Sequence, residues 1–271
     1  MLSLPEGYQA LVIGASGAIG AAFVAQLQAD RRCAHVHTLH RHSSPALDLE
    51  QPDSIAQAAA HMTRQLAAPA VGKAAANAST NASTNAATNA TTNAPPHVAE
   101  QGQPAPCLHL IVLATGFLHT PDQMPEKRLA DLDATALERS FRVNTIGPAL
   151  VLRHFAPLLA RQRSVMALLS AKVGSIGDNR LGGWYGYRAS KAALNMVVKT
   201  AAIELRRSHP GAVLVALHPG TVSSALSRPF RGEEIGRPAA VAAAQMLTTL
   251  DALQAEDSGS FVAYDGKSLP W

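Results

Sequence analysis

The chain has 271 residues, of which 47% are hydrophobic and 15% are charged, and its formal net charge is +4. This composition is typical of a globular protein and is long enough for one substantial α/β domain. The basic residues are scattered rather than gathered in one stripe, which argues against nucleic-acid binding, and no apolar run reaches membrane-spanning length. Cys33 and Cys107 are the only cysteines, so we expect buried free thiols and a reducing, cytoplasmic location.

The first elements predict a dinucleotide-binding turn. Residues 10–13 form an apolar run typical of a buried strand, and residues 21–27 are strong helix formers. The glycine-rich segment 14–20 lies between them. Glycines let the backbone approach a pyrophosphate, and the start of a helix offers N–H donors to it. The residues of this turn expected to bind the cofactor are Gly14, Ser16, Gly17, Ile19 and Gly20.

The second strand, predicted over residues 35–39, ends in a basic segment. An acidic residue here would bind the ribose hydroxyls of NAD, whereas Arg41 can pair with a 2′-phosphate, so we expect NADP, with NADPH preferred over NADH. The nearby histidines alternate between the two strand faces and lack Cys or carboxylate partners in register. We therefore expect no metal site.

Asp48 and Leu49 follow this basic segment and resemble the end of a third, short strand. The Asp48 carboxylate has two equally weighted roles, a hydrogen bond to the adenine amino group or the cap of the helix predicted over residues 55–66. Residues 67–106 then consist mainly of Ala, Asn, Thr, Ser and Pro. Such a segment buries too little apolar surface to offset its ordering entropy, so we expect a disordered insert that loops out from the amino-end side of the sheet.

The second half of the chain contains a candidate proton-transfer group. Tyr187 and Lys191 are spaced i, i+4 within a helix predicted over residues 187–205, which places them on one face, and the lysine cation is expected to lower the pKa of the tyrosine. A phenol tuned in this way can exchange a proton with a carbonyl or an alcohol. Ser170 follows the apolar strand 164–169 at its carboxyl end, where ligands bind, and is favoured over Ser175 as the hydroxyl that positions the substrate.

These motifs, in this order, resemble the short-chain dehydrogenase/reductase family. The resemblance covers the chain except for the insert. Residues 179–195 and 265–271 are similar to the subgroup of C-factor and sniffer-type carbonyl reductases. The positions that carry the family resemblance are Gly14, Gly17, Gly20, Ala114, Thr115, Gly116, Val143, Asn144, Ser170, Tyr187, Lys191 and His218 to Val222.

The resemblance implies a single doubly wound α/β domain of the Rossmann type over residues 1–271, with a mainly parallel, seven-stranded sheet in three layers. It implies that Tyr187 is the acid/base, that Lys191 also binds the nicotinamide ribose, and that Asn144 holds a proton-relaying water. It also places several residues against the cofactor, and these are Ala114, Gly116, Pro219, Gly220, Thr221 and Val222.

The function expected from the resemblance is hydride transfer between NADPH and a carbonyl or alcohol substrate. The alternative is a C-factor-like signalling or NADP-sensing protein in which catalysis is secondary. A homodimer or homotetramer is expected through the helices at residues 143–160 and from residue 187. Trp184 and Tyr185 are expected in the wall of the substrate pocket, and the loop 223–236 is expected to set specificity, with Arg228 and Arg231 more simply explained as solvated than as binding an anion.

Overall fold

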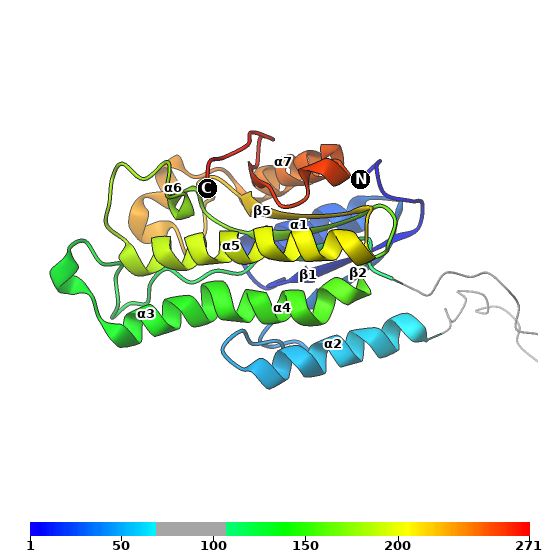
Figure 1. The fold of residues 1–271 in the computed structure, drawn as a ribbon, viewed down its shortest axis with the longest axis horizontal. Coiled ribbons are helices and arrows are strands. Elements are labelled where there is room, and N and C mark those ends of the chain that lie inside the picture. The colour runs from blue at the N-terminus through cyan, green and yellow to red at the C-terminus, as the bar shows by residue number, and fades with distance from the viewer. Residues whose placement is uncertain (69–106) are drawn as a thin grey trace, which may run out of the picture.

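A computed structural model describes residues 1–68 and 107–271 (Figure 1). The insert was predicted over residues 67–106. All of it except residues 67 and 68 lies outside the described residues. The described chain stops just after α2 (Pro52–Ala67) and resumes just before β3 (Leu110–Leu113). It therefore resumes at the amino end of that strand, at the edge of the sheet opposite the cofactor turn.

Six strands form one parallel sheet in the order β2-β1-β3-β4-β5-β6, which confirms the predicted doubly wound fold. The four inner strands of the sheet, β1, β3, β4 and β5, have largely apolar sequences, because helices cover both of their faces. Every residue of β3 and β4 is buried. The strands are β1 (Tyr8–Ile13), β2 (Cys33–Leu39), β3 (Leu110–Leu113), β4 (Ser164–Leu169), β5 (Ala212–His218) and β6 (Phe261–Ala263).

The prediction of seven strands was wrong by one within the described residues. The segment at Asp48 and Leu49 is not a strand, because its backbone is engaged locally. The Leu47 amide donates to the carbonyl of His40 (3.0 Å), and the Asp48 amide donates to Ser54 Oγ (2.9 Å). These bonds turn the chain into α2 instead of leaving its amide groups free for a ladder.

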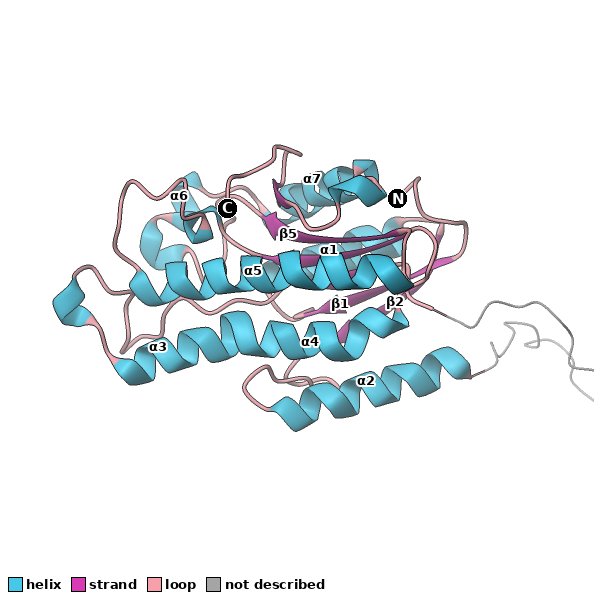
Figure 2. Ribbon diagram, viewed as in Figure 1, coloured by secondary structure: helices cyan, strands magenta, loops and turns pink. Residues whose placement is uncertain are grey.

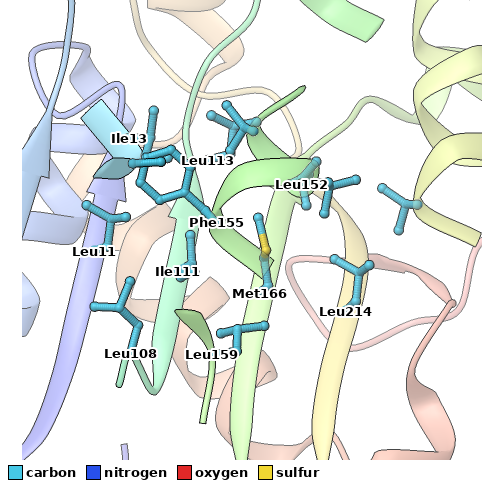
Figure 3. Close-up of a cluster of buried hydrophobic side chains, with 14 of the residues drawn as sticks. Leu11, Ile13, Leu108, Ile111, Leu113, Leu152, Phe155, Leu159, Met166 and Leu214 are labelled. Carbon is cyan, nitrogen blue, oxygen red and sulfur yellow. The ribbon is translucent and has the colours of Figure 1, made fainter. Parts of the chain in front are cut away.

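Helices cover both faces of the sheet, as Figure 2 shows by type of element. Strand residues alternate between two hydrophobic cores. One core lies under α2, α4 and α5 and contains Leu11, Ile13, Phe155 and Met166, several of which are drawn in Figure 3. The other lies under α1 and α7 and contains Val12, Phe23 and Met246. The helices are α1 (Ala18–Ala29), α2, α3 (Ala134–Phe141), α4 (Gly147–Phe155), α5 (Tyr185–Ser208), α6 (Gly232–Ile235) and α7 (Ala239–Ala252).

The helices predicted at residues 55–66, 143–160 and 187–205 are present, with shifted limits. The middle one belongs to a longer helical segment, in which α3 passes through a π-helical turn (Arg142–Ile146) into α4. Cys33 and Cys107 are free but only half-buried, so the expectation of buried thiols was too strong. In residues 1–68 and 107–271, no helix is both long and apolar enough to cross a membrane.

Candidate active site

The loops after β1, β2 and β3 enclose a cleft at the carboxyl-end edge of the sheet, which is where parallel α/β sheets bind ligands. Most of the predicted cofactor residues of this half of the chain line it. The predicted residues along the cleft are Gly14, Ser16, Gly17, Arg41, Asp48, Leu49, Ala114 and Gly116.

The turn between β1 and α1 fits a dinucleotide pyrophosphate. Gly14 has φ +86°, and a Cβ there would lie only 2.7 Å from the Ala114 carbonyl oxygen, so a side chain is excluded where the turn crosses β3. Helix α1 starts after Gly17 with no side-chain cap and no acidic residue in its first turn. Its first N–H groups are therefore available to an anion in the cleft. Gly20 packs behind the turn, where a Cβ would lie against the Gly14 carbonyl, and the contact of Gly20 and Ile19 with the cofactor stays a prediction.

The basic end of β2 and the acidic residue after it both reach the cleft. Arg41 is exposed there beside His40. The Asp48 carboxylate accepts the Glu50 amide (3.0 Å), while α2 starts after Gln51 without any side-chain cap. Of the two roles open for Asp48, the helix cap is therefore wrong, and the contact with adenine stays a prediction.

Arg139 of α3 lines the same cleft and was missed by sequence reasoning. Its guanidinium pairs with Glu50 (3.2 Å) and lies 4.7 Å from the centroid of the Phe117 ring. Nothing local in the sequence marks it, because these partners come from two other segments of the chain.

Helix α5 brings Tyr187 and Lys191 to the same edge of the sheet, and both side chains are buried. Lys191 Nζ lies 5.9 Å from the centroid of the Tyr187 ring and donates to the Leu169 carbonyl (2.9 Å) at the end of β4. A Cβ on Gly116 would lie 3.7 Å from Lys191 Nζ and 3.9 Å from Asn144 Oδ1. Gly116 therefore joins the cofactor cleft to the predicted catalytic residues.

Burial sets the protonation of this pair. It raises the pKa of Tyr187, and it lowers the pKa of Lys191 from 10.5 to about 7. The expected lowering of the tyrosine pKa is therefore wrong for the chain by itself, because removing the phenolate from water outweighs the nearby cation. Tyr187 is consequently a protonated phenol at neutral pH.

Asn144 lies in the π-helical turn, a feature that often marks functional sites in helices. The residue is 1% exposed, and both polar atoms of its side chain are hydrogen-bonded. Oδ1 accepts the Phe117 amide (2.8 Å), and Nδ2 donates to the Phe117 carbonyl (2.7 Å) and to Ser190 Oγ (3.1 Å). Asn144 thus fixes the loop after β3 to α5, one residue from Lys191.

Ser170 lies at the end of β4 as predicted, but its hydroxyl is engaged elsewhere. Strand alternation points it toward α5, where Oγ donates to Asn195 Oδ1 (2.6 Å). Asn195 is two helical turns beyond Tyr187, so this bond does not bring Ser170 to the phenol. Ser175 follows a short helical turn at Lys172–Gly174 that packs on Lys191, and its Oγ accepts the Asp178 amide (3.1 Å).

The turn after β5 completes this edge. Arg237 donates to the Pro219 carbonyl through its guanidinium and to the Thr221 carbonyl through its amide (3.0 Å). Gly220 adopts φ +69°, and the side chain of Val222 is buried in the core, so only its backbone can face a ligand. His218 joins the turn to the loop after β4 by accepting the Lys172 amide (3.1 Å), and burial lowers its pKa to about 4.

A parallel sheet with an open glycine turn at its first crossover, and a buried tyrosine and lysine at the same edge, defines a dinucleotide-binding oxidoreductase. The family described as enoyl-(acyl carrier protein) reductase matches residues 53–268. The chain belongs to the short-chain dehydrogenase/reductase family, as the sequence motifs predicted.

Two curated relatives are more similar than the solved structures. The chain is 36% identical over 153 residues to 1-hydroxy-2-glutathionyl-2-methyl-3-butene dehydrogenase of Rhodococcus sp., a match to 56% of this chain and 66% of the relative. It is 38% identical over 145 residues to C-signal of Myxococcus xanthus, covering 53% of this chain and 83% of the relative.

The fold matches an NADPH-bound carbonyl reductase from chicken fatty liver, with a TM-score of 0.71, 22% identity, and coverage of 99% of this chain and 100% of the other. It also matches the carbonyl reductase Sniffer of D. melanogaster, with a TM-score of 0.71, 20% identity, and coverage of 98% and 99%. At these identities the matches support the fold.

Proposed function

We propose that this chain transfers a hydride between NADPH and a carbonyl or alcohol substrate, with Tyr187 as the acid/base. The observation that carries the proposal is the position of Gly116, which is shared by the cofactor cleft and by the buried groups of Lys191 and Asn144. A reducing cofactor in this cleft would therefore end beside Lys191 and the Tyr187 phenol.

Each of these residues has a separate role in the proposed reaction. The open N-terminus of α1 and Gly14 bind the pyrophosphate, and Arg41 binds a 2′-phosphate, which favours NADP over NAD. Bound NADPH supplies the hydride that adds to the carbonyl carbon. Tyr187 is protonated because burial raises its pKa, so its O–H donates to the carbonyl oxygen and gives the alcohol. Lys191 returns a proton to the phenolate, since its lowered pKa makes its ammonium a ready donor near neutral pH.

The hydroxyl that orients the substrate has two candidates with different contacts. Removal of the Ser170 hydroxyl leaves Asn195 without its partner, so Ser170→Ala is expected to lower stability as well as turnover. Ser175→Ala removes an acceptor from one loop amide. The variant whose kcat falls at least about tenfold while the folded protein still binds NADPH normally identifies the orienting hydroxyl.

The decisive experiment is titration of the purified protein with NADPH and NADH, followed by NADPH oxidation in the presence of a panel of aldehydes and ketones. Tyr187→Phe preserves the ring and removes the proton, so it is expected to bind NADPH normally and to lose turnover by at least about 100-fold. Turnover that survives in Tyr187→Phe would refute the assignment of the acid/base.

A binding or signalling role is the second candidate, favoured by the 38% identity to C-signal. In that case, NADPH binds tightly and no carbonyl or alcohol in the panel is converted. The buried lysine and tyrosine argue for catalysis, because a protein that only binds the nucleotide does not need to bury an ionisable pair.

We also propose that the chain forms a homodimer or homotetramer through α4 and α5. Met196 (66% exposed) and Ile203 (56% exposed) lie seven residues apart and therefore on one face of α5, and Ile146 (50% exposed) ends the π-helical turn before α4. Exposed apolar side chains that share a face are typical of association surfaces.

A further inference from the structure

An aromatic cluster lies next to Tyr187 and is assembled from three distant segments. The Trp184 ring is 6.3 Å from that of Tyr187 and 4.7 Å from that of Phe230, in the loop after β5. His119, in the loop after β3, is 5.6 Å from Phe230 and is bonded to the Leu226 carbonyl (3.1 Å). Trp184, Phe230 and His119 are all partly exposed, so their rings are available to a ligand.

The backbone holds the Trp184 ring in place at a conformational cost. Trp184 is left-handed, with φ +54° and ψ +43°, and follows Gly182 and Gly183, which are also left-handed. A bulky residue rarely adopts this conformation unless its surroundings impose it, and such residues gather at functional sites.

Glu126 helps to hold Trp184 in this left-handed conformation. Its backbone carbonyl accepts the Trp184 amide, and its buried carboxylate accepts the Gly186 amide (3.2 Å) at the start of α5. Arg188 adds bonds to the carbonyls of Gly183 (2.9 Å) and Val173 (3.1 Å). Glu126 and Arg188 therefore fix Trp184 relative to Tyr187, its neighbour on the same helix turn. Sequence reasoning missed both, since neither has a motif of its own.

The four charged residues of the loop 226–235 form two ion pairs. Arg228 pairs with Glu233 (2.7 Å), and Arg231 pairs with Glu234 (2.8 Å). All four side chains are more than half exposed, so they are solvated, as expected from the sequence, and they neutralise one another. The loop 226–235 thus adds aromatic surface beside Tyr187 but no net charge.

We propose that Trp184 and Phe230 determine specificity and select neutral carbonyl compounds that carry a flat aromatic group beside the carbonyl. This inference rests on the proposed reductase function. The rings stack on the aromatic group, which places the carbonyl oxygen at the Tyr187 hydroxyl, and a negative charge on the substrate finds no free cation in the loop 226–235. Stacking and edge contacts between aromatic rings favour such a substrate over an aliphatic one of similar size.

The test compares benzaldehyde, hexanal and 4-carboxybenzaldehyde as substrates of wild type, Trp184→Leu and Phe230→Leu. Wild type is expected to prefer benzaldehyde in kcat/KM over both others. Each leucine variant is expected to lose roughly 3- to 10-fold on benzaldehyde, mainly through KM, and clearly less on hexanal, because each removes one ring contact. Trp184→Phe keeps a ring and is expected to recover most of the loss.

Two controls separate this effect from damage to the loop. Leu181→Ala changes a side chain that is 93% exposed in the same loop and is expected to leave all three substrates unaffected. The Kd for NADPH is expected to stay unchanged in the leucine variants. If Trp184→Leu does not fold, Phe230→Leu and the wild-type preference still decide the question.

Equal losses on benzaldehyde and hexanal, or a wild type without aromatic preference, would overturn the specificity proposal while leaving the reductase intact. A preference for 4-carboxybenzaldehyde that disappears in Arg228→Gln would also overturn it in favour of an anionic substrate. Absence of NADPH oxidation with all three aldehydes and the wider carbonyl panel would instead count against the proposed function itself.

Discussion

Replacement of Lys191 by methionine is expected to stabilise the chain while abolishing its proposed activity. Lys191 is 2% exposed, and burial lowers its pKa from 10.5 to about 7. At about 1.36 kcal/mol for each pKa unit, burying the ammonium costs about 5 kcal/mol below pH 7. Methionine has a similar length and no charge. It leaves the Leu169 carbonyl without its donor, which costs about 1–3 kcal/mol. The net gain expected at pH 6 is about 2–4 kcal/mol.

The gain must depend on pH in a defined direction. Because folding lowers the pKa of Lys191, the unfolded chain binds more protons between about pH 7 and 10.5. The free energy of unfolding of the wild type therefore rises with pH through this window, and the burial penalty shrinks to about 2 kcal/mol at pH 9. The advantage of Lys191→Met is then expected to shrink at pH 9 to between about +1 and −1 kcal/mol.

The assay is urea unfolding followed by far-UV circular dichroism at pH 6 and pH 9. Lys199→Met is the matched control, because Lys199 is exposed on the same helix and its replacement should change stability little at either pH. If Lys191→Met shows the same change in stability at both pH values, or is less stable than wild type at pH 6, then burial of the cation does not govern this site.

Three further predictions concern the cofactor turn, the cofactor preference and assembly. In urea unfolding, Gly14→Ala is expected to lower the free energy of unfolding by about 2–4 kcal/mol, through left-handed backbone strain and overpacking. Gly7 is also left-handed but has open space around it, so Gly7→Ala should lower the free energy of unfolding by only about 1–2 kcal/mol. Equal losses in the two variants would show that the contact with Ala114 after β3 does not matter. Arg41→Ala is expected to raise the Kd for NADPH at least about tenfold in a fluorescence titration and to leave that for NADH nearly unchanged, and a parallel shift in both would exclude a 2′-phosphate contact. Met196→Asp combined with Ile203→Asp is expected to yield monomers in analytical ultracentrifugation, and an unchanged mass would place the association surface elsewhere.

The sequence predicted those parts of the fold that depend on local pattern. The apolar runs at residues 10–13 and 164–169 are strands, and the helix that carries Tyr187 and Lys191 forms because strong helix formers such as alanine, leucine, lysine and arginine recur along it. The segment at Asp48 and Leu49 was the exception. It resembles a strand end, but the nearby Ser54 hydroxyl satisfies the Asp48 amide, and an isolated short pattern does not reveal such a partner.

For the candidate site too, the sequence predicted the features that depend on local pattern and not those that depend on distant contacts. By itself the sequence determined the family, the glycine turn, and the pairing of Tyr187 with Lys191, because these depend on residues close together along the chain. Only the tertiary structure decided the contact of Ser170 with Asn195, the hydrogen bond from the Trp184 amide to the Glu126 carbonyl, and the direction in which the pKa of Tyr187 shifts. Each of these depends on burial and on partners contributed by other segments, and neither spacing nor composition specifies which distant side chain fills the space beside a buried polar group.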